Sequence, residues 1–562
     1  MELTLSSCHS EVLVVIGAGA TATLGMPQTS AQTDLFRKLS EDGADFEGIL
    51  KEFFDGKNLS KLVSFFKVLE GSRDDPGNLR VSDDDLREMR NIFRHYGDED
   101  ALRNRILELR RDYDWSALKK ILNVCPHNKT KDNLIRDAYS LIDKKLLNNQ
   151  SVKVRADDSG EESLSVSRVQ GARNFLTLMI NMLFAAAWYK ITLGEKSDEF
   201  EKYKAFLNTF GKMMQDEGHE FYARGYNPKD RDFYLFTCSF VSLNFEMVFP
   251  WILMNSHREL NTSRRTYIKD HPMKLWLDYG VEHRGRKPDD DKGAAVPTLE
   301  FTESVASREN EEEHVGTPLN RAGKFYFAHG SSYWRECPVC GRMTFFNGGN
   351  KWDYKSQKLI PPFPISFFED ENYEHLTKKE WHWREDLLHY DSMQCMHCGS
   401  ETFAYSAPMI MQTFYKSTPT SFLEEIQRNV KVALEKARHI ILLGYQLPSE
   451  DVAWQQTFAE AVRCRMKSGN RARCTVVVGH KGESRWLYDA ELENYVSAYR
   501  KDDDAEAYGV PAIENAWAIF GKENVRAWTG GIPQVFGDCT KNDVRELLYP
   551  DFVDWNGTRL EK

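Results

Sequence analysis

The stretch VLVVIGAGATATLGMP, residues 12–27, decides the fold class of this chain. Its first five residues are apolar and mostly β-branched, which predicts a buried strand. Gly17, Gly19 and Ala22 follow with the spacing G-x-G-x-x-G/A, in which backbone N–H groups approach a diphosphate at the start of a helix. A tight strand-to-helix turn without a ligand explains the same residues, so this motif alone leaves both interpretations open.

Further strands and helices follow much later in the chain. The run FYLFTCSFVSLNF, residues 233–245, predicts a second buried strand, and strands alternate with amphipathic helices over residues 422–480. Such alternation is typical of an α/β fold with a parallel sheet. A dehydrogenase of the Rossmann type needs a second strand and an acidic residue about 20 residues after the glycines. Residues 31–67 show helical periodicity instead, which disfavours that enzyme class.

Length and composition restrict the number of domains, the binding partners and the location that we expect. The 562 residues exceed one typical domain, and the formal net charge of -11 argues against broad binding to nucleic acid or anionic membranes. The N-terminus lacks the basic region of a secretory signal, so we expect a cytoplasmic protein. The longest apolar run, Phe175 to Tyr189, is too short to span a bilayer and predicts a buried helix.

Four of the ten cysteines form two pairs with C-x-x-C spacing, CPVCG and CMHCG. In each pair both thiolates can face one metal ion, and two such pairs make a closed structural zinc site. Reduced free thiols are the alternative, and His397 within the second pair is a possible substitute ligand. The predicted zinc ligands are Cys337, Cys340, Cys395 and Cys398.

Two polar residues stand where strands are expected to end. Asn244 leaves the buried strand of residues 233–245, and a polar amide at such a place must find partners or face a cavity. His329 precedes Gly330 and lies eight residues before Cys337. An asparagine that caps a turn and a histidine packed in the core are the ordinary alternatives. Glu246, close behind Asn244, either faces solvent or holds part of a site.

Four segments, GAGATATLGMP, SLNFE, HGSSYWRECPVC with CMHC, and LLGYQLPSED, resemble in this order the sirtuin family of NAD-consuming enzymes. The resemblance is closest to the divergent bacterial branch found in antiviral defence systems. It covers roughly residues 11–30 and 233–480, and it implies a sirtuin-like parallel sheet of the Rossmann-like kind, a zinc-ribbon small domain and a large helical insertion.

The resemblance also implies roles for individual residues. Asn244 would hold a water or the nicotinamide ribose, and His329 would be the base on a ribose hydroxyl. Where this family often ends a strand with an asparagine at the adenosine ribose, this chain has Val478, Gly479 and His480. The residues expected to bind NAD are Gly17, Ala18, Gly19, Ala20, Thr21, Gly25, Pro27, Gly444, Tyr445 and Gln446.

Departures from the family pattern point to a particular reaction. Deacylating sirtuins follow Gly-Ile-Pro with Asp-Phe-Arg, whereas Gly25-Met26-Pro27 is here followed by Gln28-Thr29-Ser30. The family's Thr-Gln-Asn-Ile-Asp is here Ser-Leu-Asn-Phe-Glu. These losses resemble the hydrolase branch, so we expect an NAD glycohydrolase that releases nicotinamide and ADP-ribose. The alternatives are an NAD-dependent protein-lysine deacylase and a non-enzymatic nucleotide sensor or scaffold.

The same resemblance suggests a division of the chain and a mode of control. Because uncontrolled NAD hydrolysis would kill the cell, we expect a homo-oligomer, a partner protein or a small-molecule trigger, with no membrane and no direct nucleic-acid partner. The expected parts are an NAD-binding domain (1–30, 233–282 and 401–480), a helical insertion (31–232), a loose insertion (283–322), a catalytic-histidine and zinc module (323–400) and a C-terminal extension (481–562).

Overall fold

The computed structural model describes most of the chain, with gaps. The described residues are 12–41, 43–54, 56–70, 81–92, 98–125, 134–155, 160–192, 197–223, 238–262, 267–268, 271–272, 274–278, 319–332, 334–336, 343–345, 392–394, 401–403, 409, 421–448, 451–467, 472–479 and 481–549.

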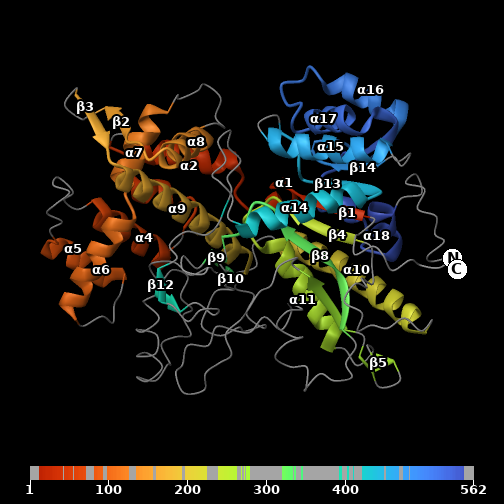
Figure 1. Ribbon diagram of the computed structural model, residues 1–562, viewed down its shortest axis with the longest axis horizontal. Helices are drawn as coiled ribbons and strands as arrows, with labels where there is room; N and C mark the ends of the chain where they lie inside the picture. Colours follow the sequence, from red (N-terminus) through yellow and green to blue (C-terminus); the bar gives the residue numbers. More distant parts are fainter. Residues whose placement is uncertain are drawn as a thin grey trace.

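An eight-stranded sheet forms the centre of the α/β part of the molecule (Figure 1). All of its neighbouring strands run parallel except the pair β15–β16. The expected α/β fold with a mostly parallel, Rossmann-like sheet is thus confirmed. In spatial order the strands are β15 (Trp486–Leu487), β16 (Val525–Trp528), β14 (Arg473–Val477), β13 (His439–Leu443), β1 (Val12–Ile16), β4 (Cys238–Ser242), β8 (Leu319–Phe327) and β7 (Lys274–Asp278).

The middle strands are buried along their whole length, because helices cover both faces of the sheet. Such strands are rich in apolar residues, as the sequences of β1 and β13 show most clearly. On one face α14 (Ser421–Lys436) packs on α15 (Val452–Lys467), which packs on α17 (Val510–Phe520). On the other face α10 (Ser197–Ala223) packs against α11 (Val248–Thr262) and α18 (Lys541–Leu548).

The segment after residue 480 is part of this sheet, whereas the sequence suggested a separate extension. Its strand β16 pairs with β14, and α16 (Asp489–Tyr499) packs on β16. The strand is only four residues long and contains Arg526, so its sequence has no apolar run to reveal it. Arg526 is buried and donates to the Thr475 hydroxyl, which explains how a charged residue is accommodated there.

The helical insertion forms a block beside the sheet (Figure 1). This insertion is not wholly helical, because it contains the hairpin β2 (Val152–Arg155) and β3 (Glu161–Leu164), whose strands are too short for a clear alternation in the sequence. The helices are α2 (Thr29–Ser40), α3 (Phe46–Leu50), α4 (Gly56–Glu70), α5 (Asp83–Ile92), α6 (Glu99–Asp112), α7 (Trp115–Val124), α8 (Leu134–Leu147) and α9 (Val166–Thr192).

Helix α9 contains the apolar run Phe175 to Tyr189 and confirms the predicted buried helix. Its Trp188 packs against Trp251 of α11, with ring centroids 5.1 Å apart, so α9 joins the helical block to the sheet. Nowhere in the described part of the chain is a helix both long and apolar enough for a bilayer crossing. Helix α10, which also falls within the expected insertion, packs on the sheet layer instead.

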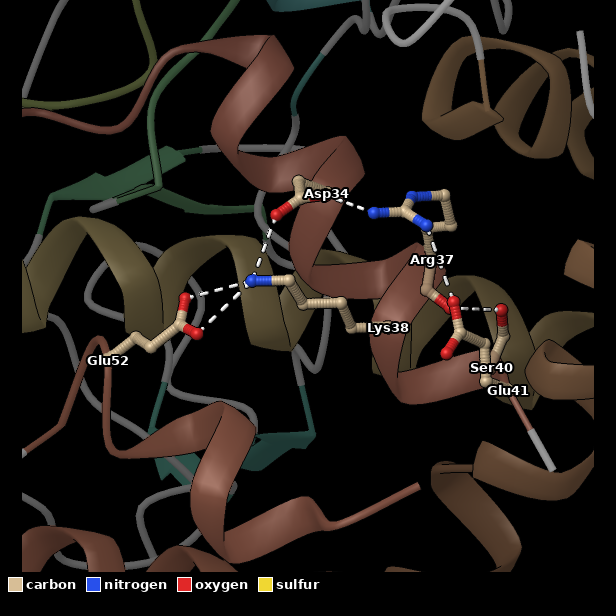
Figure 2. A network of polar contacts seen from close by, with 6 residues as sticks. All are labelled: Asp34, Arg37, Lys38, Ser40, Glu41 and Glu52. Carbon is tan, nitrogen blue, oxygen red and sulfur yellow. Dashed lines mark hydrogen bonds and ion pairs between the residues drawn. The ribbon is translucent and has the colours of Figure 1, made fainter. Parts of the chain in front are cut away.

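Helix α2 leads from the glycine loop into the helical block. On its outer face Lys38 bonds Asp34 and Glu52, both at 3.1 Å, in the network shown in Figure 2. Such exposed ion pairs contribute at most about 1 kcal/mol. Its inner face buries Leu35 and Phe36 completely, so apolar packing fixes the orientation of α2.

Candidate functional site

The glycine loop after β1 packs directly against the loop after β13. The amides of Gly17 and Gly19 donate to the carbonyls of Leu443 and Gly444, both at 3.0 Å. A Cβ atom added at Gly17 would lie 2.6 Å from the Gly444 carbonyl oxygen, so a larger residue does not fit. Close backbone packing therefore accounts for both glycines in this conformation, without reference to a ligand.

In the turn that follows, the backbone amides of the loop also donate to carbonyls of the loop itself. The Ala20 amide donates to the Gly17 carbonyl at 2.9 Å, and the Thr21 amide donates to the Ala18 carbonyl at 3.4 Å. Helix α1 (Gly19–Ala22) begins here, and the Tyr203 hydroxyl of α10 donates to the Ala20 carbonyl. The turn is thus held from the sheet and from α10 together.

The residues after β13 lie at the same sheet edge but point in different directions. Gly444 has a left-handed φ of 64°, and a Cβ atom there would lie 2.0 Å from the Ala20 nitrogen. Tyr445 is buried and its hydroxyl donates to the Asp451 carboxylate at 2.9 Å. Gln446 is exposed. Gly444 therefore touches the glycine loop, whereas the Tyr445 side chain is engaged on its own loop.

Asn244 and Glu246 form a buried polar cluster with the glycine loop. The Asn244 amide Nδ2 donates to the Gly17 carbonyl and to Glu246 Oε1, each at 3.0 Å. The Thr21 hydroxyl donates to the same Oε1 at 3.0 Å, and the Val248 amide donates to Oε2 at 2.6 Å. Burial raises the pKa of Glu246, while these three donors oppose that effect. Strong hydrogen bonding thus fixes the orientation of the Asn244 amide.

This cluster lines a pocket between the sheet edge and the helical block. Pro27 and Ala18, both expected at the nucleotide, belong to the lining, whereas Gly25 has a left-handed φ of 86° and open space around it. The lining residues are Ala18, Thr21, Met26, Pro27, Thr29, Gln32, Ile135, Arg136, Tyr139, Phe184, Leu243, Asn244, Phe245 and Glu246.

His329 lies just behind this pocket. The strands β1, β4 and β8 end at one edge, because the Leu243 amide donates to the Ile16 carbonyl and the Ala328 amide donates to the Ser242 carbonyl. His329 follows directly and is fully buried. Its ring lies 6.3 Å from the Phe245 ring, between centroids, although His329 itself is absent from the described lining.

Both ring nitrogens of His329 have partners. Nδ1 lies 3.2 Å from the Leu243 carbonyl oxygen, and the indole Nε1 of Trp454 donates to Nε2 at 2.7 Å. An indole N–H can only donate, so Nε2 accepts, and Nδ1 carries the proton that is donated to Leu243. Nε2, the ring nitrogen that can accept a hydrogen bond in this tautomer, is therefore occupied by Trp454.

The four cysteines of the two C-x-x-C pairs lie outside the described residues, as does His480. In the sequence, one pair falls between β9 (Trp334–Glu336) and β10 (Met343–Phe345), and the other falls between β11 (Ser392–Gln394) and β12 (Glu401–Phe403). Both pairs of strands are antiparallel. Among the described residues no cluster of histidine, cysteine or acidic side chains fits a metal. The zinc site stays a prediction.

Sequence reasoning missed the residues that the helical block and α15 contribute. Arg136 and Tyr139 of α8 and Phe184 of α9 line the pocket, and Trp454 of α15 contacts His329. The spacing of residues 136 and 139 places both on one helix face. Only the packing of the block against the sheet determines that this face meets the pocket.

No protein-family model matches this chain, and no curated protein is significantly similar to it.

Proposed function

We propose that this protein is an NAD glycohydrolase that cleaves NAD⁺ into nicotinamide and ADP-ribose. The observation that carries the proposal is the pocket at the carboxyl ends of β1 and β4, where Asn244 and Glu246 are hydrogen-bonded to each other. Ligands of open α/β sheets bind outside the carboxyl ends of strands where the strand order reverses. Here the order reverses beside β1, since β4 lies on one side of it and β13 on the other.

The reaction breaks the bond between ribose C1′ and the nicotinamide nitrogen. The bonding electron pair stays on the ring nitrogen and neutralises its positive charge, so the leaving group needs no proton. A water oxygen then bonds to C1′ and loses a proton to a base. Asn244 is suited to orient the water or a ribose hydroxyl, because Gly17 and Glu246 fix its amide.

His329 is the proposed base. It can act as one only if the Trp454 indole leaves its Nε2 atom. A base must come within hydrogen-bond reach of the proton that it takes, and such contacts often form only in the substrate complex. Nε2 of His329 becomes available when the Trp454 indole turns away, because that indole now donates to it. The contact thus represents a resting state of the proposed enzyme.

The Trp454→Phe variant is expected to hydrolyse NAD about fivefold faster than the wild type in the absence of any activator. Phenylalanine keeps the ring but removes the donor to Nε2, and one such hydrogen bond is worth about 1 kcal/mol. Initial rates of nicotinamide release measure the effect. Trp517→Phe in α17 is the matched control. Unchanged or reduced activity in Trp454→Phe would identify Trp454 as a support for His329.

A direct test incubates the purified protein with NAD, with and without an acetyl-lysine peptide, and separates the products by chromatography. ADP-ribose without peptide supports the hydrolase. Nicotinamide release that requires peptide and yields O-acetyl-ADP-ribose assigns the protein to the deacylases. Binding of NAD without turnover under any condition assigns it to the nucleotide sensors.

The proposal includes a structural zinc ion bound by Cys337, Cys340, Cys395 and Cys398. Elemental analysis of the purified protein is expected to find a zinc ion for each chain. Cys395→Ser should lose that metal, whereas Cys464→Ser, which changes an exposed free thiol, should retain it. Full zinc content in Cys395→Ser would contradict the assignment.

The proposal also includes a biological setting. We expect the enzyme to act in the cytoplasm as an effector of bacterial anti-phage defence, where NAD depletion stops the infected cell. Since constant activity would be lethal, we expect control by a partner protein, a small-molecule trigger or homo-oligomer formation.

A further inference from the structure

We infer that the helical insertion completes this pocket as a phosphate-binding site, in which Arg136 of α8 selects substrates that carry a 5′-phosphate. The inference rests on the proposed function and names the substrate class of the same site. It assigns a specificity role to a segment outside the strand-end motifs of the sheet.

The first step is that four backbone amides of the glycine loop already have acceptors within the protein. Helix N-termini bind phosphate through backbone amides that have no other acceptor. In this chain the amides of Gly17, Gly19, Ala20 and Thr21 all donate to carbonyls of the protein. A phosphate in the pocket could use these four amides only by breaking their present hydrogen bonds, so a nearby cation with side-chain donors would favour its binding.

The second step is the charge of the pocket. Among the described residues that line it, Arg136 is the only cation and Glu246 is the only acidic residue. A phosphate close to the Glu246 carboxylate is repelled unless a cation lies near. A guanidinium group meets this need well, because its planar donors bind two phosphate oxygens at once.

The third step is that packing of α8 against α9 fixes the position of Arg136. It is half-buried on α8, and its neighbour Ile135 is buried. One turn further along, the Tyr139 hydroxyl bonds the Thr177 hydroxyl of α9 at 3.0 Å. Because α9 reaches the sheet through Trp188, Arg136 is held at a fixed place relative to Asn244.

The experiment compares three substrates that share the nicotinamide ribose: NAD, nicotinamide mononucleotide and nicotinamide riboside, which has no phosphate. In Arg136→Gln, kcat/KM for NAD and the mononucleotide is expected to fall about tenfold to a hundredfold. The value for the riboside should stay within about twofold, since no charged contact is lost there. Arg136→Lys keeps the positive charge but lacks the planar guanidinium group. Its kcat/KM for NAD should lie between the values of the wild type and of Arg136→Gln.

The matched control is Arg37→Gln, which changes an exposed arginine on the outer face of α2 (Figure 2). It should leave all three substrates unaffected. An equal loss for the riboside and the phosphorylated substrates in Arg136→Gln would overturn the inference, because a purely structural role predicts that result. No loss for any substrate would overturn it as well.

A binding measurement separates this inference from the proposed reaction. Calorimetry with NAD and nicotinamide riboside is carried out on the wild type and on Arg136→Gln. If the wild type binds NAD without hydrolysing it, the glycohydrolase proposal fails, while selective loss of NAD binding in Arg136→Gln still supports the phosphate site. If the wild type binds NAD no better than the riboside, the phosphate site itself is refuted.

Discussion

The Asn244→Ala variant is expected to lose NAD hydrolysis by about 100-fold to 1,000-fold in kcat. Removal of one preorganised hydrogen-bonding group from an active site has effects of this size. Both hydrogens of Asn244 Nδ2 donate to Gly17 and Glu246, so the atom offered to a water or a ribose hydroxyl is the acceptor Oδ1. The amide of Asn244 is fixed by Gly17 and Glu246 before any ligand arrives, so its alignment costs little in the reaction. Nicotinamide release under substrate saturation measures the change.

A control must distinguish lost chemistry from lost structure, because the same amide links two loops. Asn148→Ala, which changes an exposed asparagine at the end of α8, should keep full activity. Asn244→Ala should still fold and bind ADP-ribose, with a lower unfolding midpoint, because the Gly17 carbonyl and the Glu246 carboxylate each lose a buried donor. If Asn244→Ala keeps its turnover, Asn244 is not part of the reaction. If it loses folding and turnover together, the role of Asn244 is structural.

The second large effect concerns stability. Gly444→Ala is expected to reduce the free energy of unfolding by roughly 2–5 kcal/mol. Part of the loss is the left-handed backbone at this position, with φ of 64°, and part is the 2.0 Å approach of the new Cβ to the Ala20 nitrogen. The glycine loop would have to move away from β13. Urea denaturation followed by circular dichroism measures the change.

Gly25→Ala is a matched control for the backbone contribution. Its φ of 86° is also left-handed, but a Cβ atom there meets nothing within 4 Å. Gly25→Ala should reduce the free energy of unfolding by about 1–2 kcal/mol, which is the effect of the left-handed backbone alone. Equal losses in the two variants would show that the glycine loop adapts to a methyl group at position 444.

The central strands were predictable because they are buried on both faces. The strands β1 and β13 are therefore almost entirely apolar and stand out in the sequence. The strand β16 is different, since Arg526 interrupts its apolar character. That arginine is tolerated because its neighbours supply polar partners, including the Thr475 hydroxyl and the Tyr488 hydroxyl. Such partners are brought together only by folding.

The candidate site was predictable to the same extent. Parallel strands bring their carboxyl ends to one edge, so the sequence positions of Gly17, Asn244 and His329 were enough to expect them there. The contact between Trp454 and His329 was not predictable, because it depends on how α15 lies across the sheet. Arg136 belongs to an insertion, and no local pattern in the sequence predicts how that insertion packs against the sheet.

The pairing of β1 has a consequence for protein synthesis. Val12 pairs with Cys238 on one side and with His439 on the other, so β1 waits for partners that are translated much later. Such non-local pairing is slow and leaves apolar strands uncovered in the nascent chain. The glycine loop likewise reaches its packed form only when Gly444 has been translated. A growing chain therefore lacks the assembled sheet edge until the segment that contains Gly444 has been made.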